Sequence, residues 1–123
     1  MTLNELSGPL ELEIITGSPD TEITDGYTSD LLSDVMANAV EGSALITIQA
    51  HNNAVAVASH VDLPAIILCN SRPVTDDMLA SAQEHGIVVC RSPLNQFTVS
   101  GILYSLLERP VPPGRPGTGQ NDG

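Results

Sequence analysis

The sequence predicts an α/β fold of three layers, in which helices cover a mainly parallel sheet of about four to five strands. A strand followed by a helix occurs three times in succession between residues 44 and 108. The strands are continuous apolar runs, which is typical of strands that helices cover on both faces. Each helical segment is about ten residues long, which is the usual spacing of βαβ units.

The repeats begin and end at residues that favour element boundaries. Thr75 and Asn95 are predicted N-caps, and Gly86 is a predicted C-cap. Pro64 and Pro93 stand between elements, where a proline disturbs the backbone least. The predicted strands are 44–48, 65–69 and 87–90, and the helices that follow them are 53–61, 76–85 and 96–108.

The N-terminal part has shorter patterns. Thr2 and Glu5 predict a capping box for a helix over 3–6. Alternating apolar residues predict a strand over 10–14, and the sequence Gly-Ser-Pro-Asp at 17–20 predicts a turn.

The next stretch leads into a further helix. Residues 22–29 predict an extended segment, with a tight turn or a bulge at Asp25-Gly26. Ser29 or Asp30 is the predicted N-cap of the helix that follows. The apolar residues that would share one face of this helix are Leu31, Leu32, Val35, Met36 and Ala39.

Length and composition set the domain organisation. The 123 residues fit one domain, which we assign to 1–109, and we interpret the Pro- and Gly-rich segment 110–123 as a disordered tail. Cys69 and Cys90 each end an apolar run, so we expect them to be buried as small hydrophobic residues. No signal peptide is recognisable and no apolar run approaches the ~20 residues of a membrane span, which predicts a cytoplasmic location.

The chain is strongly acidic. Four basic residues, all arginine, stand against fifteen carboxylates and give a net charge of −11. Because clusters of Lys and Arg are missing, neither nucleic acid nor an anionic membrane is an expected partner. The acidity has two interpretations, which are solubility and attraction to a basic partner protein.

Polar residues follow the predicted parallel strands. The carboxyl ends of such strands lie along one edge of the sheet, where open α/β sheets hold their ligands. We therefore predict a shared ligand pocket there, in which Arg91 holds an anionic group and Arg72 is the other nearby cation. The residues assigned to it are Thr47, Gln49, His51, Asn70, Arg91 and Ser92, with Ser29 and Asp30 flanking them.

The same residues have plainer interpretations. They could be ordinary loop residues that cap helices, and His51 could be a helix-start histidine and not a base. Asp30 and Asp34 are four residues apart and could pair on one helix face to bind a metal. Capping by Asp30 and exposure of Asp34 is the favoured interpretation, so we predict no metal and no cofactor.

No enzyme motif is present in the sequence. We find no Walker lysine motif, no GxGxxG, no HExxH and no GxSxG. These motifs mark kinases, dehydrogenases, zinc proteases and α/β-hydrolases, so we predict that the chain is not an enzyme.

Two separated blocks resemble the DRTGG domain family. The block Ser-Asp-Leu-Leu-Ser-Asp-Val-Met at 29–36 and the later Thr47, Gln49 and His51 agree with that family in type and order. Within the motif that gives the family its name, Thr21 replaces the arginine. The residues that match this motif are Asp20, Ile23, Thr24 and Gly26. The second departure is Asp25, which stands in place of the first glycine.

The resemblance covers nearly all of residues 2–108 and implies a stand-alone domain like the N-terminal domain of HPr serine kinase/phosphorylase. Such domains are regulatory and often lie at dimer interfaces, so it implies a non-catalytic homodimer. We expect it to bind a nucleotide or other anionic metabolite at the strand ends. The alternative is an accessory subunit that docks on a larger enzyme or signalling complex without a small ligand.

Overall fold

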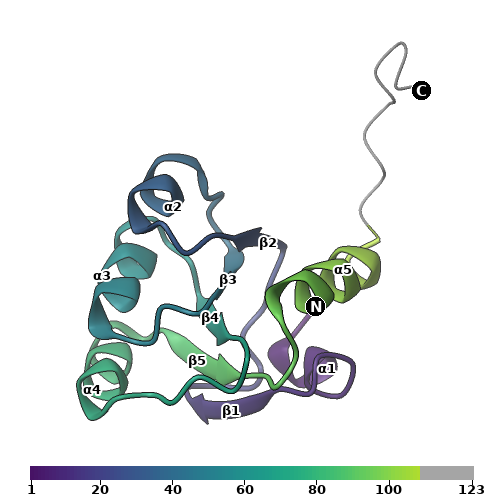
Figure 1. The fold of residues 1–123 in the computed structure, drawn as a ribbon, viewed down its shortest axis with the longest axis horizontal. Helices are drawn as coiled ribbons and strands as arrows, with labels where there is room; N and C mark the ends of the chain where they lie inside the picture. The colour runs from purple at the N-terminus through teal and green to yellow at the C-terminus, as the bar shows by residue number, and fades with distance from the viewer. Residues whose placement is uncertain (109–123) are drawn as a thin grey trace.

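A computed structural model of the chain describes residues 1–108, which form five helices and five strands (Figure 1). The strands are β1 (Glu13–Thr16), β2 (Asp25–Thr28), β3 (Ser43–Thr47), β4 (Ala65–Leu68) and β5 (Val88–Arg91). The helices are α1 (Leu3–Ser7), α2 (Leu32–Asn38), α3 (Asn52–His60), α4 (Asp76–His85) and α5 (Gln96–Leu106). Across these residues, none of the helices combines the length and the apolar character that crossing a membrane requires.

The strands form one mixed sheet in the order β1-β5-β4-β3-β2. β2, β3, β4 and β5 are parallel neighbours, and β1 joins β5 in the antiparallel direction. The predicted α/β fold with a mainly parallel sheet is confirmed. β1 corresponds to the strand predicted over 10–14, but its antiparallel direction was not predicted.

Helices cover both faces of this sheet. Figure 1 shows α2, α3 and α4 along one face and α1 with α5 along the other. Neighbouring residues on one strand enter opposite cores, since Leu45 packs with the first group of helices while Ala44 and Ile46 pack with the second. This alternation explains why the central strands are apolar at every position.

Local signals placed several element ends correctly. Thr2 and Glu5 form the predicted capping box of α1. The hydroxyl of Thr75 accepts from the N–H of Met78 to cap α4, and Gly86 ends that helix with a φ of 67°. Such a positive φ is one that glycine adopts without steric cost.

The predicted strand over 10–14 was wrong at its start. β1 begins at Glu13, because the residues before it are tied back to α1 by turn hydrogen bonds. The N–H of Leu12 donates to the carbonyl of Ser7 at 2.8 Å, and Glu11 has a φ of 52°. The alternation of apolar residues therefore begins before the strand does.

The predicted turn or bulge at Asp25-Gly26 was also wrong. These residues belong to the regular strand β2, whose register on β3 is unbroken from Asp25 to Thr28. Gly26 serves close packing instead, since a Cβ atom there would lie 2.9 Å from Cδ2 of Leu103 on α5.

The predicted cap and buried face of α2 need correction. Leu31 is the N-cap and makes no side-chain cap bond, because the carboxylate of Asp30 turns to the end of β3. Val35 is buried as expected, but Leu31 and Met36 are 65% and 47% exposed. The interpretation of 110–123 as a disordered tail concerns residues outside the described part of the chain.

Candidate functional site

The carboxyl ends of the four parallel strands meet at one edge of the sheet. Their order follows the chain from β2 to β5 without a reversal, and α2, α3 and α4 lie on the same face. A reversal of strand order is what opens a crevice in doubly wound sheets. Here the edge carries a layer of hydrogen-bonded side chains, and α5 reaches it from the opposite face.

Asp30 lies at the centre of this layer. Its Oδ1 accepts from the hydroxyl of Thr47 at 2.8 Å and from the N–H of Ile48 at 2.9 Å. Gln96, the first residue of α5, donates to both carboxylate oxygens at 3.1 and 3.2 Å. One carboxylate therefore joins the segment before α2, the end of β3 and the start of α5.

A second chain of hydrogen bonds runs from Asp30 to α3. The Nε2 of Gln49 donates to the carbonyl of Asp30 at 2.9 Å, and its Oε1 lies 2.9 Å from Nε2 of His51. The Nδ1 of His51 accepts from the N–H of Asn53 at 3.3 Å and so caps α3. Because Nδ1 accepts, the ring proton of neutral His51 sits on Nε2 and donates to Gln49.

The environment of Asp30 stabilises its charged form. Partial burial alone would raise the pKa. The bonds from Ile48, Thr47 and Gln96, together with the charge of Arg72, hold the pKa of Asp30 below its ordinary value. The carboxylate is thus ionised at neutral pH and has its charge partly balanced.

The loop after β4 holds an unusual backbone. Asn70 and Ser71 are consecutive non-glycine residues with φ values of 57° and 52°. Their N–H groups donate to the carbonyls of Leu94 and Ser92, both at 2.9 Å, which anchors this loop to the one after β5. The side chains of Asn70, Ser71 and Arg72 are exposed at the strand-end edge.

Two predicted site residues have partners elsewhere. Arg91 forms an ion pair with Glu13 of β1 at 2.9 Å. Ser92 is buried, where its hydroxyl donates to the carbonyl of Leu10 at 2.7 Å and accepts from the N–H of Leu94. Ser29 accepts from the N–H of Leu31, next to Asp30.

The strand-end layer thus brings together four of the eight predicted residues, namely Asp30, Thr47, Gln49 and His51. Asn70 lies on the neighbouring loop. Sequence reasoning missed Gln96, which completes the layer. Gln96 directly follows the Asn95 cap. This position indicates a contact with Asp30 only once α5 is known to cross to the far face of the sheet.

Asp30 and Asp34 do not form a carboxylate pair. Asp34 instead accepts from the hydroxyl of Tyr27 at 2.8 Å. This bond raises the pKa of Tyr27 and lowers the pKa of Asp34, whose charged form it stabilises. Within residues 1–108 no cluster of three or more His, Cys, Asp or Glu side chains is placed to hold a metal ion.

The fold matches that of a solved structure, the CBS and DRTGG domains of the regulatory region of Clostridium perfringens pyrophosphatase complexed with the activator diadenosine tetraphosphate. The TM-score is 0.63 and the sequence identity is 15% over 83% of this chain and 45% of that chain. The present chain thus spans less than half of that one, and at this identity the likeness is one of fold. No family model and no curated protein sequence matches the chain.

Proposed function

We propose that the chain is a non-catalytic regulatory domain that binds a small anionic ligand at the carboxyl ends of β2 to β5. The ligand class is a nucleotide or another metabolite with a phosphate or carboxylate group. A DRTGG-like fold supports a regulatory role, because the structural match belongs to the regulatory region of an enzyme and carries a nucleotide activator.

One observation carries the proposal, which is the backbone of the loop after β4. Asn70 and Ser71 are consecutive and both occupy the left-handed region, which asparagine adopts readily but serine adopts less often. Backbone strain of this kind concentrates at ligand sites, where it fixes side chains in place before binding. Here it presents the Asn70 amide and the Arg72 guanidinium at the strand-end edge.

Seven of the eight residues predicted from the sequence have one of two roles in this proposal, and Arg91 has neither. Asn70 contacts the ligand together with Arg72, which replaces Arg91 as the cation because Arg91 is paired with Glu13. The residues that position this surface are Ser29, Asp30, Thr47, Gln49, His51 and Ser92, whose polar groups bond within the fold.

The first test is a thermal-shift screen against nucleotides, acyl phosphates and carboxylate anions, followed by calorimetry on each hit. A ligand at about 100 times its Kd adds roughly 2.7 kcal/mol to the free energy of unfolding. In Arg72→Ala the affinity should fall by about tenfold or more, which is the loss of one charge-assisted hydrogen bond. Arg91→Ala is the matched control, since it removes an equal charge from the same edge and should leave affinity unchanged.

Two results would contradict the proposal. One is a hit whose affinity is equal in Arg72→Ala and the parent chain. The other is a screen in which none of the anions raises the melting temperature.

The proposal includes a homodimer, which the charge distribution supports. α5 has no charged residue from Gln96 to Leu107, and Phe97 and Tyr104 are exposed on it at 88% and 44%. Two chains of net charge −11 repel each other least where carboxylates are missing. Sedimentation of the purified chain tests this part, and a monomer at all concentrations would refute it.

A second candidate function is docking on a larger protein without a small ligand. Its support is the pair Leu31 and Phe97, exposed at 65% and 88%, which directly follow the bonded residues Asp30 and Gln96 in the chain. Large exposed apolar side chains beside polar groups are typical of protein interfaces. A screen without hits, together with loss of a partner contact in Phe97→Ser, would favour this function.

A further inference from the structure

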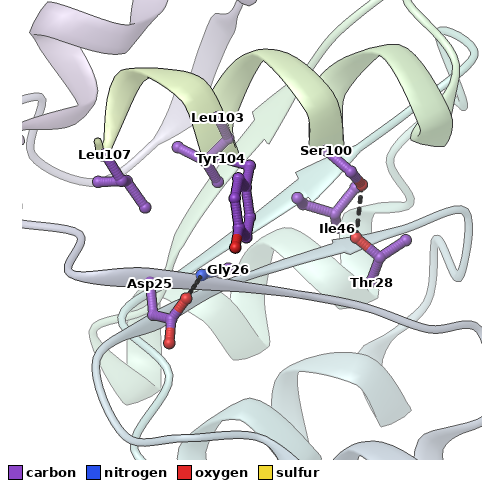
Figure 2. Close-up of a pocket in the computed structure, with 8 residues that line it drawn as sticks. All are labelled: Asp25, Gly26, Thr28, Ile46, Ser100, Leu103, Tyr104 and Leu107. Atoms are coloured by element: carbon purple, nitrogen blue, oxygen red, sulfur yellow. Dashed lines mark hydrogen bonds between the residues drawn. The ribbon is translucent and has the colours of Figure 1, made fainter. Parts of the chain in front are cut away.

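Phe97 is the most exposed of the large apolar side chains in the described part of the chain. Its exposed fraction is 88%, and it belongs to neither of the two cores that pack against the sheet. Tyr104, the other aromatic residue of α5, is 44% exposed and extends toward β2 beside a cavity of about 120 Å³ (Figure 2). The ring of Tyr104 therefore lies against the fold, whereas the ring of Phe97 is open to solvent.

The start of α5 holds Phe97 at the strand-end edge. Gln96 donates to the carboxylate of Asp30 at 3.1 and 3.2 Å, and Phe97 is the next residue in the chain. Helical side chains tilt toward the helix N-terminus, and Phe97 is the second residue of α5. Its ring therefore extends toward the loop between β5 and α5. Leu31, which directly follows Asp30 and is 65% exposed, adds apolar surface at this edge.

The exposed cation of this edge is anchored to the same loop. The N–H of Asn70 donates to the carbonyl of Leu94, and the N–H of Ser71 donates to the carbonyl of Ser92. Arg72 follows these residues directly and is exposed. An aromatic ring and a guanidinium group thus stand at one edge of the sheet, linked through the loop between β5 and α5.

We infer that the ligand of the strand-end edge is a nucleoside phosphate, whose base stacks on Phe97 while its phosphate pairs with Arg72. This inference rests on the proposed anion site and narrows its ligand to one with a planar ring. Any nucleobase can stack on an exposed aromatic side chain, because every base has a π-face. The net charge of −11 opposes the binding of a bare anion, so an uncharged contact favours a nucleotide over a small phosphate or carboxylate.

The test compares AMP with ribose 5-phosphate by calorimetry on the full chain. Both carry the same phosphate group, and only AMP carries a base. AMP should bind about tenfold more tightly or better, which is the contribution of one stacked base. Phe97→Leu should remove this advantage and leave the affinity for ribose 5-phosphate unchanged. Tyr104→Leu is the matched control on the same helix and should change neither affinity.

Phe97→Trp gives a direct signal of stacking. The chain has no tryptophan, so the emission of the variant reports on this position alone. AMP should quench the emission and ribose 5-phosphate should not, because only a stacked base contacts the ring. Emission that changes with protein concentration and not with AMP would assign Phe97 to a contact between two chains and overturn the inference.

The outcomes separate this inference from the proposed function. Equal affinities for AMP and ribose 5-phosphate, both weakened in Arg72→Ala, would overturn stacking and leave the anion site in place. An advantage of AMP that survives Phe97→Leu would also overturn it. Binding of neither probe would refute the nucleotide, and the anion site would then be decided by the other anions of the thermal-shift screen.

Discussion

At the scale of single residues, Asp30 has the largest share of the strand-end contacts. Its carboxylate accepts from Thr47, Ile48 and Gln96, and its carbonyl accepts from Gln49. A residue predicted as a helix cap thus holds three segments together. Its pKa lies below the ordinary value, so the folded state prefers the ionised form and binds that proton more weakly than the unfolded chain.

This preference predicts a pH dependence of stability. The contribution of Asp30 is fully present above the unfolded pKa of about 3.9 and is lost as the pH falls through the lower folded value. At pH 7, Asp30→Asn should reduce the free energy of unfolding by about 1–2 kcal/mol, because charge-assisted hydrogen bonds become neutral ones. The difference between parent and variant should shrink as the pH falls from about 5 to about 2.

Urea unfolding across this pH range measures the difference. Glu84→Gln provides the comparison, since it removes one carboxylate from an exposed position on α4. A gap between the parent and Asp30→Asn that stays constant with pH would show that the ionised carboxylate does not stabilise the fold.

At the scale of elements, α4 and α2 show when local signals suffice. α4 begins after Thr75 and ends at Gly86 as predicted, because cap bonds and a left-handed glycine act within a few residues. α2 lacks a side-chain cap, since Asp30 is drawn to the end of β3 by Thr47. The carboxylate of Asp30, which would otherwise cap α2, is therefore occupied by a tertiary hydrogen bond.

Gly86, which ends α4, and Gly101, which lies within α5, predict changes in stability of opposite sign when each is replaced by alanine. Gly86→Ala should lower the free energy of unfolding by about 1–2 kcal/mol, because alanine is strained at the φ of 67°. Gly101 lies within α5, where an added methyl group would meet open space, so Gly101→Ala should raise stability by up to about 1 kcal/mol. Thermal unfolding of both variants compares them, and changes of the same sign would contradict this account.

At the scale of the whole molecule, charge opposes folding. The net charge is −11, and the described residues contain two ion pairs, Met1 with Glu22 and Arg91 with Glu13. Both pairs lie at the surface, where such pairs contribute little. Repulsion among carboxylates should therefore lower the stability of the compact state.

This repulsion predicts stabilisation by salt. Raising NaCl from about 0.02 M to about 0.3 M shortens the screening length and should raise the melting temperature by about 4 °C or more, corresponding to about 1 kcal/mol. Near the sequence pI of about 4.2 the same salt step should have little effect. A melting temperature that is insensitive to salt at pH 7 would show that charge repulsion has little effect on the free energy of unfolding.

The sequence by itself determined the layered α/β class, the parallel central strands and several of the helix ends. These follow from apolar runs and cap residues, whose effects act over a few neighbouring positions. The polar residues after the strands were found in the same way, because parallel strands must end at one edge of the sheet.

Only the tertiary structure decided what those polar residues contact. Gln96 meets Asp30 across 66 positions of sequence because α5 crosses to the face opposite α2, α3 and α4. β1 joins β5 antiparallel and takes Arg91 into an ion pair with Glu13. The choice of face and of strand neighbour depends on how whole elements bury their apolar sides together, and no local pattern in the chain encodes it.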